Sequence, residues 1–284
     1  QRRYDRFRNR IMFPIRDVRG RVIAFGGRTI GEELPKYMNS PETPIFHKSS
    51  ELYGLYEARQ QNKALKRVVI VEGYMDVVSL NQHGITYAVA TLGTATNPRH
   101  LQKLLRYTNE VIFCFDGDNA GRNAAWKALT ISLPTMRDGI HLRFLFLPQD
   151  EDPDTLIQKI GREKFEKLLD ESAMLSTVFF NHLQNEIPLK SLDGKAHFAK
   201  EAATYLNTMP EGLFRQLLFK QLGELLHIGA EELMALLANP KPTQPTQHPH
   251  RSDEVLPPAY LAIARLLQKP SLVSGINNPE GLAQ

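Results

Sequence analysis

The chain has 284 residues, 42% of them hydrophobic, and a formal net charge of +4 at pH 7, which is sufficient for a proper core in one large or two medium domains. Its single cysteine, Cys114, excludes an internal disulfide and a cysteine-rich zinc site. It contains no run of roughly 18 apolar residues, and the charged start QRRYDRFRNR excludes a secretory signal, so we expect a cytoplasmic protein with no membrane contact. Because the first residue is Gln1 rather than Met and lies inside a dense basic segment, we also expect a fragment.

The first 28 residues are strongly basic. They contain nine arginines against two aspartates, a charge of about +7. Such a block is typical of a nucleic-acid contact, and Tyr4, Phe7 and Phe13 lie between the arginines as possible stacking surfaces for a single strand. The alternative interpretation is a charged face that contacts only solvent.

A hairpin is predicted directly after this start. Apolar runs at 11–15 and 22–25 flank a turn at 17–20. The next stretch, up to residue 50, contains Pro35, Pro41 and Pro44 and is predicted to hold no regular element.

The stretch VVIVEGYMD at 68–76 organises the rest of the chain. Its four consecutive β-branched residues predict a strand buried on both faces, as in a parallel sheet flanked by helices. The strand ends at Glu72, and the helical spacing that follows puts Asp76 in the first turn of the next helix. Open α/β sheets bind ligands at this end of their strands, although Asp76 alone would fit equally as a partner of the helix dipole.

A second strand of the same kind, VIFCFDGD at 111–118, ends in Asp116 and Asp118. If neighbouring parallel strands bring Glu72 beside them, three negative charges share one region, and two charges ~6 Å apart repel by ~3 kcal/mol at an effective dielectric constant of ~20. No basic residue adjoins them in the sequence. Because all-oxygen ligands select Mg²⁺ or Mn²⁺, the sequence predicts a site for the two ions used in phosphoryl transfer.

The remaining elements follow from the same patterns. Strands are predicted at 68–72, 86–91, 111–116 and 142–147, alternating with helices near 74–83, 97–107 and 119–133, which indicates a parallel sheet. An acidic loop then carries Asp152 and Asp154, of which Asp154 also fits as the N-cap of a helix beginning at 155. Residues 155–238 are predicted to be helical throughout and to form a small bundle.

Four stretches resemble the bacterial replicative primase of the DnaG type, whose catalytic core contains a Toprim domain. They are PKYMNSPETPIFHKSSELYGLYEA, VVIVEGYMDVVSL, CFDGDNAGRNAAWKAL and FLPQDEDPDTLI. The resemblance runs from about residue 2 to about residue 238. It implies an α/β fold in which a Toprim-type parallel sheet flanked by helices is preceded by a basic β/loop subdomain and followed by a small helical bundle.

The resemblance, together with the proline-rich composition of 239–253, predicts a division into five parts. These are an incomplete basic part of the catalytic core at 1–66, the Toprim domain at 67–150, a helical subdomain at 151–238, a proline-rich linker at 239–253, and the incomplete start of a helicase-binding domain at 254–284.

Site residues carry over from the family by position. The catalytic carboxylates would be Glu72, Asp116 and Asp118. Two Mg²⁺ or Mn²⁺ ions would be held by these three together with Asp76, Asp152 and Asp154. The ligands for nucleotide phosphates and single-stranded nucleic acid would be Arg6, Arg8, Arg28, Lys36, Asn39 and Lys48. Taken singly, each of these last six would fit equally as an exposed loop residue.

The activity that the resemblance implies is that of a primase, a DNA-directed RNA polymerase that joins NTPs into a short RNA on a single-stranded DNA template during bacterial replication. Expected protein partners are the replicative helicase, through the largely missing carboxyl-terminal domain, and single-stranded-DNA-binding protein. Family members hold zinc only in an amino-terminal domain that this sequence lacks, so we expect no zinc here.

Two other functions remain open at this point. One is another Toprim enzyme, a topoisomerase or a nuclease, which supercoil relaxation or strand cleavage would reveal, although we identify no separate domain with the tyrosine that a topoisomerase needs. The other is a non-catalytic Toprim scaffold that loads proteins onto DNA, which absence of primer synthesis would favour.

Overall fold

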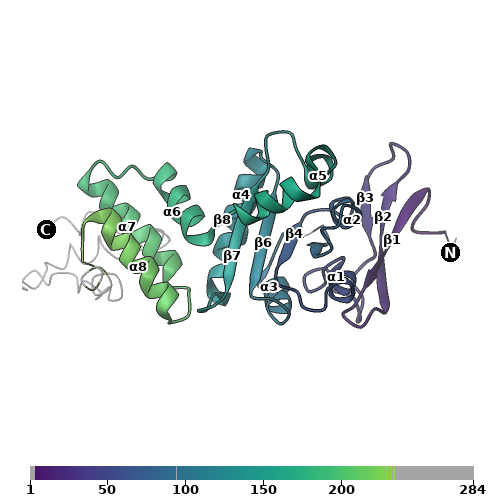
Figure 1. Cartoon of the computed structure of the whole chain (residues 1–284), viewed down its shortest axis with the longest axis horizontal. Helices are drawn as coiled ribbons and strands as arrows, with labels where there is room; N and C mark the ends of the chain where they lie inside the picture. Colours follow the sequence, from purple (N-terminus) through teal and green to yellow (C-terminus); the bar gives the residue numbers. More distant parts are fainter. Residues whose placement is uncertain (1–3, 94, 230, 232, 234–284) are drawn as a thin grey trace, which may run out of the picture. The chain divides into compact units, whose positions relative to one another are not determined.

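The computed structural model describes residues 4–93, 95–229, 231 and 233 (Figure 1). The chain divides into two compact units, 1–238 and 239–284, and only the first is described below. The linker predicted at 239–253 and the segment at 254–284 therefore lie outside the described residues. Within the described part, no helix is both long and apolar enough to cross a membrane.

The basic amino-terminal part forms a three-stranded antiparallel sheet. Its strands are β1 (Arg10–Arg16), β2 (Val22–Thr29) and β3 (Tyr37–Asn39), in that order across the sheet. The first two confirm the predicted hairpin, but the prediction of no regular element before residue 50 is wrong at β3. Pro35 and Pro41 flank this short strand rather than interrupt it, so its backbone still pairs with residues 26–28 of β2.

The second sheet has five strands in the order β5-β4-β6-β7-β8. They are β4 (Val68–Val71), β5 (Ala88–Ala90), β6 (Glu110–Phe115), β7 (His141–Phe146) and β8 (Ala173–Met174). All neighbours are parallel except β8, which pairs antiparallel with β7. The four predicted strands are confirmed, whereas the prediction that 155–238 is helical throughout is wrong at β8. Arg143 on β7 donates to the Ser172 hydroxyl and carbonyl, which holds the chain against the sheet edge before the next helix begins.

Eight α-helices and one short 3-10 helix, η1 (Leu133–Thr135), are found in the described residues. The α-helices are α1 (Leu55–Gln61), α2 (Tyr74–Gln82), α3 (Pro98–Leu104), α4 (Asn119–Ser132), α5 (Pro153–Asp170), α6 (Leu175–Glu186), α7 (Leu192–Leu206) and α8 (Leu213–Leu226).

Helices cover both faces of the five-stranded sheet, which explains the unbroken apolar runs in its strands. Val69 and Val71 of β4 pack with Leu80 of α2 and Phe165 of α5 on one face. The alternate residues of the strands pack against α1, α3, α4 and α6 on the other face. All four residues of β4 are consequently buried.

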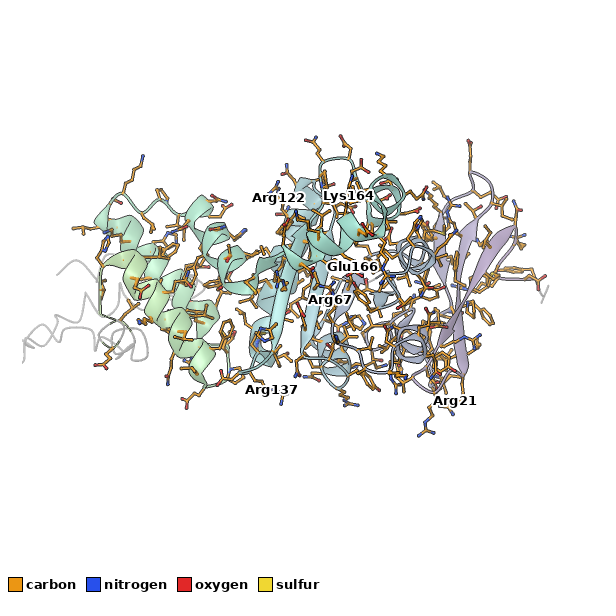
Figure 2. All side chains as sticks on the ribbon, in the orientation of Figure 1. Arg21, Arg67, Arg122, Arg137, Lys164 and Glu166 are labelled. Carbon is orange, nitrogen blue, oxygen red and sulfur yellow. The ribbon has the colours of Figure 1, made fainter. Side chains whose placement is uncertain are left out.

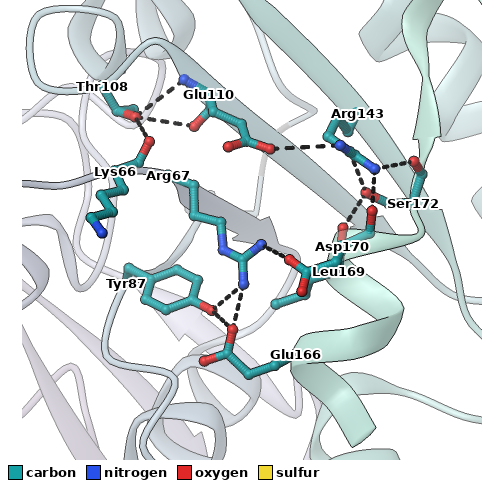
Figure 3. A network of polar contacts seen from close by, with 10 residues as sticks. All are labelled: Lys66, Arg67, Tyr87, Thr108, Glu110, Arg143, Glu166, Leu169, Asp170 and Ser172. Carbon is teal, nitrogen blue, oxygen red and sulfur yellow. Dashed lines mark hydrogen bonds and ion pairs between the residues drawn. The ribbon is translucent and has the colours of Figure 1, made fainter. Parts of the chain in front are cut away.

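A polar network ties the amino-terminal ends of the strands to α5 (Figure 3). Arg67, which precedes β4, forms ion pairs with Glu166 and Asp170 of α5 and also donates to the Tyr87 hydroxyl. Arg67 and Glu166 pair as two half-buried side chains, whereas Arg21 projects from the β1–β2 hairpin (Figure 2). This network is at the end of the sheet opposite to Glu72, so it fixes the sheet without entering the candidate site.

Aromatic contacts join the sheet domain to the helical bundle. Trp126 of α4 stacks on His182 of α6 at a ring-centroid distance of 3.8 Å and meets Tyr205 of α7 edge-on at 5.2 Å. The only tryptophan of the chain therefore has a packing role here.

Candidate active site

Three helices begin at the carboxyl ends of neighbouring strands, and each has a predicted metal ligand at its N-cap or in its first turn. Asp76 accepts a hydrogen bond from the Gly73 amide at the start of α2, at 2.9 Å. Asp118 is the N-cap of α4 and accepts from the Gly121 amide at 2.7 Å. Asp152 is the N-cap of α5 and accepts from the Thr155 amide at 2.6 Å. The positive ends of three helix dipoles thus meet the acidic groups at one edge of the sheet.

Two glycines allow the turn between β6 and α4 to pack this closely. A Cβ on Gly117 would lie 2.1 Å from the Leu147 carbonyl oxygen, in the segment that leads from β7 to α5. A Cβ on Gly121 would lie 2.2 Å from the Asp116 carbonyl oxygen. Neither position has room for a side chain, so the DGD turn needs glycine to bring Asp116 and Asp118 against the neighbouring acidic loop.

Burial and mutual repulsion raise the pKa values of the central acids. Burial raises the pKa of Asp76 to about 7, and the charges of Asp152, Asp116 and Asp154 add to the rise against the opposing Gly73 hydrogen bond. Burial, then Asp152 and Asp118, raises the pKa of Asp116.

Glu72 belongs to the same group of acids. Although it is exposed as a whole residue, its carboxyl group is sufficiently desolvated, and sufficiently close to Asp116 and Asp118, for its pKa to be raised. The structure therefore brings together all six acids of the prediction in one electrostatic cluster, named here the acidic edge.

One detail of the acidic loop differs from the sequence prediction. The N-cap of α5 is Asp152, not Asp154, because the helix begins at Pro153. Asp154 lies in the first turn, where its carboxylate accepts from the side-chain amide nitrogen of Gln158. Glu151, which precedes this N-cap, pairs with Lys159 at 2.5 Å.

The carboxylate oxygens of the acidic edge are suitable ligands for a divalent cation, but they do not form a complete coordination shell. Among the described residues, no three or more His, Cys, Asp or Glu side chains converge tightly enough to hold an ion. Three of the six carboxylates instead accept hydrogen bonds from backbone amides. None of the six forms an ion pair with a described residue, so their mutual repulsion is uncompensated within that part of the chain. Mg²⁺ commonly takes only one or two protein carboxylates and completes its shell with water and substrate phosphates, so these donors fit it.

A third, smaller core fixes the basic sheet beside the acidic edge. Tyr74, two residues after Glu72, stacks on Phe13 of β1 at 5.3 Å and meets Tyr53 edge-on at 4.8 Å. A Cβ on Gly26 of β2 would lie 2.7 Å from the Tyr74 ring, so glycine is required there for this contact. Sequence analysis missed this role of Tyr74, because the contacts join segments that are far apart in the chain.

Asn39 takes part in this junction rather than projecting freely from a loop. Its side-chain amide donates to the Leu92 carbonyl oxygen at 2.9 Å, and its side-chain oxygen accepts from the Tyr74 hydroxyl. The contacts observed for this predicted nucleic-acid ligand therefore connect β3 to the segment that leaves β5 and to the start of α2.

The basic residues divide into two groups. Arg10, Arg16 and Arg21 are engaged in local structure: Arg10 donates to backbone carbonyls, Arg16 pairs with Glu57, and Arg21 pairs with Asp17. These three arginines therefore contact other parts of the protein, and the alternative interpretation of a face that contacts only solvent does not describe them.

The predicted phosphate ligands make fewer contacts of this kind. Within the described residues, Arg6, Arg28, Lys36 and Lys48 form no ion pair, and Arg8 lies over the exposed Tyr4 ring at 5.7 Å. The buried Nε atom of Arg28 has no hydrogen-bond partner there. Arg28 lies two residues beyond Gly26 on β2, so it is on the sheet face that meets Tyr74.

A pocket of about 400 Å³ opens next to Glu72, between the sheet and α4. Its walls include Thr91, Gly93, Cys114 and Lys127. Gly93 has a left-handed φ of 70°, which shapes the turn that leaves β5.

Comparison with known proteins identifies relatives over most of the chain. Three family models match: a DNA primase catalytic core N-terminal domain at residues 1–59, a Toprim-like domain at 69–157, and a DnaB-helicase binding domain of primase at 176–231. The last match falls on the helical bundle and not on the predicted helicase-binding segment at 254–284.

The relatives themselves are primases. The DNA primase of Escherichia coli K12 is 48% identical over 285 residues, and the match covers 99% of this chain but 48% of that protein. A DNA primase domain from Pseudomonas aeruginosa is 51% identical with a TM-score of 0.80, and the match covers 84% of this chain and 74% of that one. A DnaG primase catalytic domain solved bound to single-stranded DNA is 53% identical with a TM-score of 0.78, covering 81% of this chain and 73% of that one. The chain thus spans about half the length of the curated relative and most of the solved catalytic domains.

Proposed function

Since this chain belongs to the DnaG family of DNA primases, we propose that it is the catalytic part of an enzyme that synthesises short RNA primers on single-stranded DNA by metal-dependent nucleotidyl transfer. The reaction would take place in the bacterial cytoplasm during replication. The single observation that carries this proposal is the acidic edge, a cluster of six carboxylates in which no member forms an ion pair with a described residue.

In the proposed reaction, Glu72, Asp116 and Asp118 hold two divalent ions, with Asp76, Asp152 and Asp154 in support. When bound, Mg²⁺ or Mn²⁺ supplies activation of the primer 3′-hydroxyl and charge neutralisation of the leaving pyrophosphate. Asp118 and Asp152 are oriented by their helix-capping hydrogen bonds, so they lose little side-chain entropy when a metal binds.

The basic sheet would hold the phosphates. Arg6, Arg8, Arg28, Lys36 and Lys48 are the proposed ligands for the NTP triphosphate and the template backbone. Tyr74 and Asn39 would keep this sheet in register with the acidic edge, which supports a role for Asn39 in positioning as well as in binding.

The proposed partners follow from the relatives. A related primase domain was solved with single-stranded DNA, and the residues that correspond to a helicase-binding domain of primase are 176–231. We therefore propose single-stranded DNA and a DnaB-type helicase as partners, the helicase contact involving α6 to α8. NTPs are the proposed substrates, and single-stranded-DNA-binding protein is a further proposed partner.

The basic sheet should give salt-dependent binding of single-stranded DNA. Each neutralised phosphate contributes about −0.7 to the slope of log K against log salt concentration, so replacing Arg6, Arg8 and Lys36 together by alanine should flatten the slope by about 2. Fluorescence anisotropy with a labelled oligonucleotide at several salt concentrations measures this slope.

A matched control replaces Lys164, Lys190 and Lys200, three exposed lysines of the helical part, and so changes the net charge equally. We expect it to leave the slope nearly unchanged. Equal flattening in both triple variants would mean that only the total charge matters and that the basic sheet has no special part in binding.

The proposed function is tested by primer synthesis with the intact parent protein, a single-stranded template and labelled NTPs. Short RNA products that disappear with a chelator and return with Mg²⁺ or Mn²⁺ support it. Relaxation of supercoiled DNA or strand cleavage without RNA synthesis would contradict it in favour of another Toprim enzyme.

A further inference from the structure

His100 of α3 is a fully buried polar residue that lies outside the acidic edge. Its Nδ1 atom is 3.3 Å from the side-chain nitrogen of Asn97, and its Nε2 atom is 3.0 Å from the backbone carbonyl oxygen of Lys48. Lys48 is one of the proposed phosphate ligands. The histidine therefore connects the first turn of α3 to the segment that carries a candidate cation.

The hydrogen bonds assign the protonation of the imidazole ring. The Asn97 side-chain oxygen caps α3 by accepting from the Arg99 and His100 amides, so its nitrogen is the atom that donates to Nδ1 of His100. Nε2 then carries the hydrogen and donates it to the Lys48 carbonyl oxygen. Burial lowers the pKa of His100, which keeps the ring in this neutral form at pH 7.

The backbone of Lys48 is held on both sides. Its amide donates to Oε1 of Glu42 at 3.0 Å, and its carbonyl accepts from His100. Three residues later, Glu51 forms an ion pair with Lys103 of α3 at 2.7 Å. No described carboxylate forms an ion pair with the Lys48 ammonium group, and Glu42 contacts Lys48 through its backbone amide. These contacts therefore fix the backbone and leave the ammonium group without a direct partner among the described residues.

The chain direction from Lys48 to Tyr53 places these residues at the carboxyl ends of the parallel strands, where the acidic edge lies. Tyr53 pairs antiparallel with Ala90, the last residue of β5, through hydrogen bonds of 2.9 and 3.0 Å. Residues that precede Tyr53 therefore run beyond the carboxyl end of β5. This is the edge of the parallel sheet at which β4 ends in front of Glu72.

We propose that His100 is a positioning residue that fixes the backbone of Lys48 so that its ammonium group meets a phosphate group at the acidic edge. The inference rests on the proposed function, because it needs a phosphate ligand there. The phosphate belongs either to the NTP or to the template strand, which share this chemistry. A lysine on a fixed backbone loses less conformational freedom on binding than one on a free loop, so the hydrogen bond from His100 improves binding without touching the ligand.

Two substitutions separate positioning from simple stability. His100→Gln can place an amide nitrogen where Nε2 lies and so can keep the donor to Lys48, whereas His100→Asn reaches only the Nδ1 position and loses it. We expect His100→Asn to weaken binding of the phosphate ligand by about 3–10-fold, the loss of roughly one hydrogen bond, and His100→Gln to bind nearly as well as the wild type. The measurements, on the intact parent, are KM and kcat for NTP and the dissociation constant of single-stranded DNA. A change in KM for NTP identifies the NTP as the source of the phosphate, and a change in the dissociation constant of single-stranded DNA identifies the template strand.

A double-mutant cycle with Lys48→Ala makes the test specific. If His100 acts through Lys48, His100→Asn adds less than about a twofold effect in the Lys48→Ala background. Ser132→Ala, which removes another fully buried side-chain hydrogen bond, to the Ala128 carbonyl, is the control for general destabilisation and should leave both binding constants unchanged.

Each failure has its own meaning. If Lys48→Ala binds both ligands as the wild type does, the phosphate role of Lys48 in the proposed function is wrong. If Lys48→Ala weakens binding while His100→Asn does not, or if the two effects multiply, the positioning role of His100 is wrong. If His100→Asn does not fold, the test depends on His100→Gln. A folded His100→Gln protein that binds the ligand as weakly as Lys48→Ala contradicts the inference.

Discussion

Asp116→Asn and Asp118→Asn, each introduced into the intact parent, should reduce primer synthesis by roughly 10²–10³-fold or more, because each removes a charged ligand from the ions that stabilise the reacting phosphate. The fold should survive both changes. An asparagine at 118 still offers a side-chain oxygen to the Gly121 amide, so α4 keeps its cap, which Asp118 holds at 2.7 Å in the wild type. Primer synthesis and circular dichroism, measured on the same samples, separate loss of chemistry from loss of structure.

Asp150→Asn is the matched control for these variants. Asp150 lies in the neighbouring acidic loop and has a positive φ of 62°, which asparagine tolerates well. It should retain nearly full activity. Full activity in Asp116→Asn or Asp118→Asn would contradict the assignment of these acids to the metal site.

Asp76→Asn should stabilise the metal-free protein, and the gain should depend on pH. Because the pKa of Asp76 is raised to about 7 in the native state, the native protein binds a proton between pH of about 4 and 7 that the unfolded chain has released. The stability of the wild type therefore falls as pH rises through this window. Asparagine removes this loss and still accepts the hydrogen bond from Gly73, so the advantage of the variant should grow by about 2–3 kcal/mol between pH 5 and pH 8.

Urea denaturation in the presence of a chelator measures this difference. Asp193→Asn is the control, because Asp193 is also an acid in the first turn of a helix but is exposed on α7. Its effect on stability should be small and nearly independent of pH. An equal pH dependence in both variants would show that the pKa of Asp76 is not raised in the native state.

Strand patterns predicted the sheet well because burial on both faces leaves a direct signal in the sequence. The apolar runs that end at Glu72 and Asp116 gave both strands and the edge at which they meet. The DGD turn was recognised by its acids, although the steric need for Gly117 depends on Leu147, which lies 30 positions away and is visible only in three dimensions.

The errors of the sequence analysis have physical causes. Two-residue β8 is shorter than any periodic pattern and forms because Arg143 holds the chain that precedes it. The N-cap of α5 was placed two residues late because both Asp152 and Asp154 are good caps, and Pro153, which suits the first helical turn, decides between them.

The number of charges identifies the basic amino-terminal segment, but it does not show which of its arginines form local contacts and which are available to bind a ligand. Arg21 and its ion-pair partner Asp17 are near in sequence, whereas the buried Arg28 Nε atom, which has no hydrogen-bond partner among the described residues, results from the folding of the sheet. In the same way His100 gave no signal, because its partner Lys48 is 52 residues earlier in the chain.

The most direct test of the acidic edge is the binding of Mn²⁺ to this chain itself, measured by titration calorimetry without nucleotide or DNA. The wild type and Asp150→Asn should bind Mn²⁺ with similar affinity and release it to excess Mg²⁺. The double variant Asp116→Asn, Asp118→Asn should bind it at least about tenfold more weakly, which corresponds to about 1.4 kcal/mol. Equal affinity in the double variant, or no binding by the wild type, would contradict a metal site formed by these carboxylates.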